Sequence, residues 1–211
     1  MNYKEQRRKM VEIQLKARGI SNPDVIQAFL DVPREAFVPH DLTEQAYDDC
    51  PLPIGDEQTI SQPYMVALMS ELVQPKKEAK LLDIGTGSGY QAAILSKLCA
   101  KVVTMERIFS LSKKAQERLK KYGYKNIMFV PGDGSQGYRE DQPYDGIIVA
   151  AASPDIPHPL IDQLTVGARL IIPVGDIWGQ YLKVVTKTKD GFKVDTSVAC
   201  SFVPLVGRLG Y

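Results

Sequence analysis

Three glycines at alternate positions give this sequence its clearest chemical signal. Gly85, Gly87 and Gly89 follow the run 80–84, and Asp83 lies two residues before the first of them. A glycine has no side chain to keep a ligand at a distance, and it adopts backbone conformations that other residues avoid. The spacing differs from the dinucleotide-binding pattern G-x-G-x-x-G, whose third glycine lies one residue further along. The loop therefore indicates close approach of a ligand to the backbone, although glycine-rich turns also serve as plain strand-to-helix connections.

Two more acidic residues follow predicted strands. The apolar strand 101–106 ends in Glu106, where doubly wound nucleotide-binding folds place the acid that accepts hydrogen bonds from ribose hydroxyls. A third strand, 127–130, leads into Asp133. Such sheets bind ligands at the carboxyl ends of their strands, and all three acids lie there. A ligand site is therefore favoured over three separate solvated side chains.

These residues need a sheet of parallel strands to bring them together. Apolar strands separated by helical patterns predict an α/β fold with a doubly wound, mostly parallel sheet, and a terminal hairpin around Asp190-Gly191 predicts an antiparallel edge. The predicted strands cover 80–84, 101–106, 127–130, 144–150, 169–174, 181–187 and 192–203. The predicted helices cover 4–17, 23–30, a segment from Pro63 to before Pro75, a segment from Tyr90, 108–122 and 157–164.

The organisation of the chain follows from this pattern. Residues 1–78 are expected to form N-terminal helices and a substrate loop, and residues 79–211 the ligand-binding core, within one compact domain. Within the first part lies the segment 47–61, which contains the breakers Pro51, Pro53 and Gly55 and is expected to be mostly irregular. A loop of this length in a compact domain is usually functional or disordered. The apolar residues Leu52, Ile54 and Ile60 argue against disorder, so we expect the loop to close over the ligand.

Composition excludes several classes of protein. A net charge of +1 over 211 residues provides no footprint for non-specific nucleic-acid binding. No apolar run approaches the ~18 residues that a membrane helix needs, and the polar N-terminus lacks the apolar core of a signal peptide. Three cysteines without metal-site spacing suggest a reducing compartment, so a cytoplasmic protein without a metal is expected. His40 and His158 are expected at surface or structural positions.

Two motifs carry a family resemblance. The alternating glycine loop after an acid resembles the nucleotide loop of Rossmann-like S-adenosylmethionine (SAM) methyltransferases. Leu52-Pro53-Ile54-Gly55, followed by Gln58-Thr59-Ile60-Ser61-Gln62-Pro63, resembles the signature segment of protein-L-isoaspartate (D-aspartate) O-methyltransferases. Val32-Pro33-Arg34 before this segment and Gly132-Asp133-Gly134 after it are consistent with the same family. The resemblance covers essentially the whole chain.

The resemblance implies an activity and a set of site residues. Family members transfer a methyl group from SAM to the α-carboxyl group of L-isoaspartyl residues in damaged proteins, which speeds their return to aspartate. Ser61 matches the active-site serine, Glu106 the ribose acid, and Asp133 with Gly134 the adenine pocket. The cofactor loop is matched by Asp83, Gly85, Thr86, Gly87, Ser88 and Gly89. The substrate segment is matched by Thr59, Ile60 and Ser61.

Alternatives remain open at this point. A serine shortly before a helix-opening proline is most often an N-cap, so Ser61 is either a cap, a group that orients the substrate, or both. A SAM methyltransferase acting on another carboxylate or small molecule, and a non-catalytic SAM-binding module, are the competing functions. Asp56 and Glu57 stand where many family members have small or neutral residues, and we expect both to face solvent. A monomer is expected, with isoaspartyl proteins and peptides as its partners.

Overall fold

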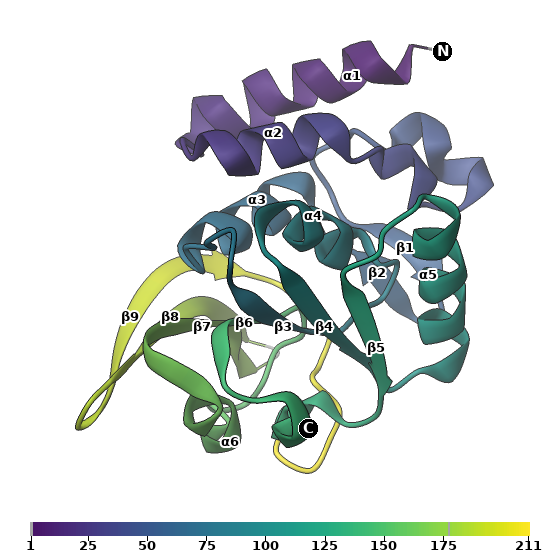
Figure 1. Cartoon of the computed structure of the whole chain (residues 1–211). Coiled ribbons are helices and arrows are strands. Elements are labelled where there is room, and N and C mark those ends of the chain that lie inside the picture. Colours follow the sequence, from purple (N-terminus) through teal and green to yellow (C-terminus); the bar gives the residue numbers. More distant parts are fainter. Residues whose placement is uncertain (1, 177) are drawn as a thin grey trace.

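The central feature of the computed structural model, which describes residues 2–176 and 178–211, is a seven-stranded sheet (Figure 1). Its strand order is β5-β4-β3-β6-β7-β8-β9, parallel from β5 to β7 and antiparallel from β7 to β9. The strands are β3 (Lys80–Ile84), β4 (Lys101–Glu106), β5 (Ile127–Pro131), β6 (Tyr144–Val149), β7 (Leu164–Asp176), β8 (Gly179–Thr188) and β9 (Gly191–Cys200). The doubly wound sheet with an antiparallel edge is confirmed.

Helices cover both faces of this sheet. Figure 1 shows α1 to α4 stacked on one face and α6 on the other. The helices are α1 (Tyr3–Met10), α2 (Pro23–Asp31), α3 (Pro63–Leu72), α4 (Tyr90–Leu98), α5 (Phe109–Lys121) and α6 (His158–Asp162). Asn22 caps α2 through hydrogen bonds from Asp24 N and Val25 N, and Pro63 opens α3 at a position where its missing N–H is not needed.

The predicted helix 157–164 covers only His158–Asp162, and the strand predicted from 169 begins already at Leu164. Three further local predictions need correction. The predicted helix 4–17 is α-helical only to Met10, continues as a π-helix over Val11–Leu15 and ends in a 3₁₀ turn, where Gly19 adopts a φ of 94°. The segment 47–61 is not mostly irregular, because it contains an antiparallel hairpin of β1 (Leu52–Gly55) and β2 (Gln58–Ile60). The last hairpin turns one residue earlier than predicted, since Thr188 pairs with Gly191.

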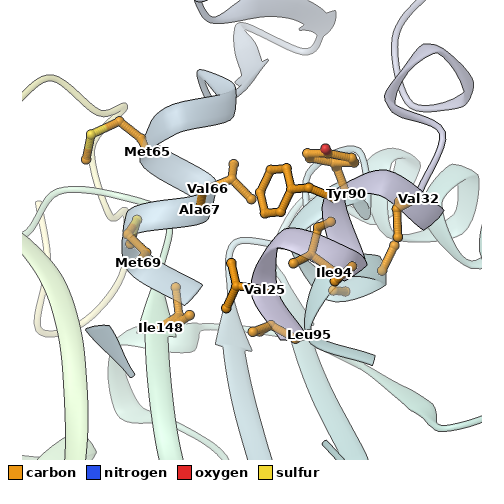
Figure 2. Close-up of a cluster of buried hydrophobic side chains, with 14 of the residues drawn as sticks. Val25, Val32, Met65, Val66, Ala67, Met69, Tyr90, Ile94, Leu95 and Ile148 are labelled. Carbon is orange, nitrogen blue, oxygen red and sulfur yellow. The ribbon is translucent and has the colours of Figure 1, made fainter. Parts of the chain in front are cut away.

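A hydrophobic cluster joins the N-terminal helices to the sheet. Figure 2 shows side chains of α2, α3 and α4, among them Val25, Val66 and Ile94, meeting Ile148 of β6. These four side chains are at most 3% exposed, so each contributes most of the roughly 1.5–3 kcal/mol expected for burying a large aliphatic side chain. The cluster fixes the first turns of α3 and α4, which both border the site described next.

Candidate active site

A pocket opens at the carboxyl ends of the parallel strands. Its walls come from the hairpin end and α3, the glycine loop with the start of α4, the end of β4 with the residues that follow it, and a segment near the C-terminus. Of the residues predicted for the site, nine line it: Thr59, Ile60, Ser61, Gly85, Thr86, Gly87, Ser88, Glu106 and Gly134. The tertiary structure thus brings the substrate segment and the cofactor loop to one cavity.

The glycine loop is held by hydrogen bonds that it donates to the strand beside it. The N–H groups of Gly85 and Thr86 both donate to the carbonyl of Met105, at 2.9 and 3.1 Å. Gly85, Gly87 and Gly89 have φ values of 93°, 50° and 87°, in the region that favours glycine. The three do not serve the same purpose. A Cβ at Gly89 would lie 3.0 Å from Leu119 Cδ1, so this glycine permits helix packing and does not line the pocket.

Glu106 holds the loop and faces the pocket. Its Oε2 accepts a hydrogen bond from Gly87 N and its Oε1 accepts one from Ile108 N, both at 2.9 Å. The residue is only 8% exposed. Each carboxylate oxygen accepts up to two hydrogen bonds, so each keeps capacity for one donor from a ligand. Two adjacent hydroxyl groups, as in a ribose, match this arrangement.

Asp83 lies behind the loop and does not line the pocket. It is fully buried, and its Oδ2 accepts a hydrogen bond from Thr104 Oγ1 at 2.7 Å. Thr104 Oγ1 lies 2.6 Å from Thr86 Oγ1, so a chain of hydroxyls links Asp83 to the loop. Burial raises the pKa of Asp83 to about 7; the Thr104 hydrogen bond opposes this rise and the charge of Glu106 adds to it. The carboxyl group can therefore support the loop without touching a ligand.

The pKa of Asp83 predicts a pH dependence of stability. Between about pH 4 and 7 the folded chain keeps this proton while the unfolded chain, with a pKa near 3.8, has lost it. Stability should therefore fall as pH rises through this range, by roughly 3–4 kcal/mol if the shift is fully expressed. We expect Asp83→Asn to remove this fall. Urea unfolding of both proteins at several pH values measures it, and parallel stability curves would contradict the prediction.

Asp133 lies beside the pocket and holds the C-terminal segment. Its Oδ1 accepts a hydrogen bond from Ser135 N at 2.9 Å, and its Oδ2 accepts one from Arg208 N at 2.8 Å. These backbone hydrogen bonds lower the pKa of Asp133 against an opposing effect of partial burial. The neighbouring Gly134 lines the pocket, and a Cβ there would lie 2.3 Å from Ile84 Cγ2. Residue 134 therefore must be a glycine for the backbone to lie this close to β3.

The hairpin that carries the substrate segment is anchored by the N-terminal helices. Arg34 Nε donates to the carbonyl of Ala46 at 2.8 Å, and Gln14 Nε2 donates to the carbonyl of Tyr47 at 2.7 Å. Arg7 Nε donates to the Tyr47 hydroxyl at 2.9 Å. These contacts fix the chain just before β1, so the N-terminal elaboration determines where β2 and the residues after it lie.

Ser61 is half-buried at the pocket wall, directly after β2. The N-cap of α3 is Gln62, and no side chain of the described residues caps this helix. The cap interpretation of Ser61 is therefore not borne out, and its hydroxyl is available to the pocket.

The acidic pair at the hairpin tip is exposed, as expected. Asp56 and Glu57 have φ values of 53° and 59°, so both occupy the left-handed region in a tight turn. Asp56 Oδ2 accepts a hydrogen bond from Ser110 Oγ at 3.0 Å, which ties the tip to α5. Glu57 is exposed yet borders the pocket mouth.

Several pocket residues were not predicted from the sequence. A backbone segment near the C-terminus forms one wall through pairing with Ala152, whose N–H donates to Val203 O at 2.8 Å and whose carbonyl accepts from Leu205 N at 2.7 Å. The unpredicted lining residues include Ile108, Ala150, Ala151, Val203, Pro204, Leu205 and Val206. They carry no polar side chain that would have marked them in the sequence.

The pocket fits the cofactor that the sequence resemblance implies. Glu106 offers two acceptors for a ribose, Gly85 and Gly87 leave the backbone open to a ligand, and Ile108 supplies an apolar surface for an aromatic base. In the described part of the chain, no group of His, Cys, Asp and Glu residues is placed to hold a metal ion. Among the same residues, no helix is long and apolar enough to span a membrane.

Comparisons with known proteins agree with this geometry. A model of the family "Protein-L-isoaspartate(D-aspartate) O-methyltransferase" matches residues 5–210. Protein-L-isoaspartate O-methyltransferases of Petrotoga mobilis and Geobacter metallireducens are each 49% identical to the chain, covering 100% of it and 100% and 98% of themselves.

Two solved structures extend the comparison. A protein-L-isoaspartate O-methyltransferase superposes with a TM-score of 0.87 at 31% identity, over 97% of this chain and 67% of its own. A Plasmodium falciparum structure assigned to the same enzyme, in complex with S-adenosyl-L-homocysteine, gives a TM-score of 0.81 at 28% identity, over 98% and 99%.

Proposed function

Since the chain belongs to the protein-L-isoaspartate (D-aspartate) O-methyltransferase family, we propose that its pocket brings SAM and the α-carboxylate of an L-isoaspartyl residue together, with Ser61 orienting the carboxylate. The protein is a SAM-dependent repair methyltransferase, and full-length similarity favours this function over a methyltransferase for another carboxylate or a non-catalytic SAM-binding module. The observation that carries the proposed site is that Ser61 and Glu106 line one cavity.

The reaction requires few catalytic groups from the protein. A carboxylate has a reference pKa near 4, so it is ionised at neutral pH and attacks without a general base. SAM, when bound, supplies a methyl group on a sulfonium leaving group. The chain must hold the carboxylate in line with that methyl group and exclude water between them. The hairpin and residues 203–206 both line the pocket and provide walls for this purpose.

The proposed role of Ser61 is orientation. A hydroxyl donates one hydrogen bond, and a carboxylate is a strong acceptor. The position of Ser61, directly after β2, is fixed by the pairing of Ile60 with Leu52. Helix α3 begins two residues after Ser61. The hydroxyl therefore projects from a rigid junction, which suits a group that sets the direction of an acceptor oxygen.

We expect Ser61→Ala to lower kcat/KM for an isoaspartyl peptide by about tenfold to a hundredfold, the range for losing one hydrogen bond to a charged group. SAM affinity should stay near wild type, because the proposed cofactor residues lie on other elements, the glycine loop and the end of β4. The free energy of unfolding should also stay near wild type, because Ser61 does not cap α3. Peptide methylation rates, calorimetric SAM titration and urea unfolding provide the three measurements.

The control is a normal aspartyl peptide of the same sequence. It carries its carboxylate at a different place along the backbone, so wild type should methylate it far more slowly. Equal rates on both peptides would contradict the repair function. If the Ser61→Ala enzyme loses stability but keeps its activity, Ser61 has a structural role and does not orient the carboxylate.

We further infer that the enzyme works as a monomer in the cytoplasm, without nucleic-acid or membrane partners. The net charge of +1 and the three free cysteines support this inference. Sedimentation equilibrium at micromolar concentration is expected to give the mass of one chain, and a stable dimer mass would contradict the monomer.

A further inference from the structure

Arg118 of α5 contacts the glycine loop from outside the pocket. Its Nη1 donates to the carbonyl of Ser88 at 2.7 Å, within the short range typical of charge-assisted hydrogen bonds. The guanidinium also lies over the Phe37 ring, with 5.9 Å between its central carbon and the ring centroid. Burial lowers the pKa of Arg118, which shows that the cation has lost part of its water. Arg118 is not among the pocket residues, so it touches neither cofactor nor substrate there.

The peptide that Arg118 holds is the one at which the loop becomes a helix. The N–H of Gly89, at the other end of the same peptide unit, donates to Thr86 O at 2.7 Å. Both polar groups of the Ser88–Gly89 peptide are thus bound inside the protein, and its plane is fixed. Leu119, the residue after Arg118, packs against Gly89, so α5 supports the loop at two successive positions.

The remaining loop peptides depend on this support. Gly87 N donates to Glu106 on the pocket side, and Tyr90 N donates to Ser88 Oγ at 3.2 Å. Without the guanidinium, the Ser88 carbonyl would lose a charged donor in a half-buried place and would turn to find another. Such a turn would also redirect the peptides of Gly87 and Ser88, both of which line the pocket.

We propose that Arg118 is a positioning residue for cofactor binding, which fixes the Ser88–Gly89 peptide and so holds the glycine loop in the form that receives SAM. This inference rests on the proposed cofactor site and adds a residue that does not touch the ligand. It concerns SAM affinity and leaves recognition of the isoaspartyl residue to Ser61 and the hairpin.

The test uses two variants, Arg118→Ala and Arg118→Met, of which the second keeps an apolar contact with Phe37. The control is Lys113→Ala, which changes an exposed residue on the same helix. Calorimetry should show SAM affinity falling about tenfold or more in both Arg118 variants and unchanged in the control. The KM for an isoaspartyl peptide at saturating SAM should stay within about twofold of wild type. In the ligand-free enzyme, amide hydrogen exchange over residues 85–90 should speed up in both Arg118 variants.

Chemical rescue separates positioning from a general structural role. Millimolar methylguanidinium should restore SAM affinity to Arg118→Ala, whose side-chain space is empty, and not to Arg118→Met, whose space is filled. Wild-type SAM affinity and loop exchange in both variants would overturn the proposal. So would faster exchange throughout the chain with a lower unfolding midpoint and no rescue. A wild-type chain that binds SAM but does not methylate isoaspartyl peptides would instead contradict the proposed function, because SAM affinity is measured without turnover.

Discussion

Glu106→Ala is expected to weaken SAM binding by about two to four orders of magnitude, because two charge-assisted hydrogen bonds worth roughly 1.5–3 kcal/mol each are lost. The structure adds a second reason. Glu106 also accepts hydrogen bonds from Gly87 N and Ile108 N, so its removal leaves two backbone donors without their acceptor and loosens the loop. Titration calorimetry with SAM measures the loss directly.

The matched control for this prediction is Glu117→Ala, which removes an exposed carboxylate from α5. It changes the net charge by the same amount without touching the pocket, so SAM affinity should stay at the wild-type value. Glu106→Gln should lie between wild type and Glu106→Ala, because the amide keeps one oxygen acceptor but presents N–H groups to a backbone donor. Unchanged SAM affinity in Glu106→Ala would refute the assignment of Glu106 to the ribose.

Gly87→Val is expected to give a folded protein that no longer binds SAM measurably. A Cβ at Gly87 would lie 3.4 Å from Ile54 Cδ1, so the folded chain has room for it after a small shift. The φ of 50° costs a branched residue about 1–3 kcal/mol, which a domain of this size tolerates. The added side chain would fill space at the pocket surface, where the ligand must approach the backbone. Circular dichroism melts and SAM calorimetry measure the two effects separately.

Gly123→Val isolates backbone strain from loss of ligand space. Gly123 also has a positive φ, 77°, and no atom lies within 4 Å of its added Cβ; it follows α5 outside the pocket. This variant should lose a similar amount of stability and keep wild-type SAM affinity. If Gly87→Val binds SAM as wild type does, the loop is only a structural turn and the proposed cofactor site is wrong.

The sequence alone predicted those helices, strands and loops whose residue patterns lie within a single element or between two consecutive ones. The strand over Lys101–Glu106 has the predicted bounds, because an apolar run between turn residues needs no distant information. The glycine loop was predicted for the same reason, since alternate glycines before a helical pattern mark a strand-loop-helix unit. The sequence resemblance identified the family and the activity, both of which the comparisons bear out.

Tertiary structure decided what depends on distant contacts. The β1–β2 hairpin was missed because its turn residues, Asp56 and Glu57, are not the Asn-Gly type that predicts such a turn, and a hydrogen bond from Ser110 to Asp56 ties the turn to α5. Asp83 was expected at the cofactor, but its full burial beside Thr104, twenty-one residues away in sequence, places it behind the loop.

The pocket wall formed by residues 203–206 shows most clearly what the sequence alone could not predict. Asp133 binds the backbone of Arg208, seventy-five residues away, and Val203 to Val206 line the pocket with backbone and apolar side chains. Nothing in their residue types marks them as part of a site. Their role follows only from the return of the chain to Ala152, beyond the carboxyl end of the central strand β6, because a backbone hydrogen bond depends on position and not on side-chain identity.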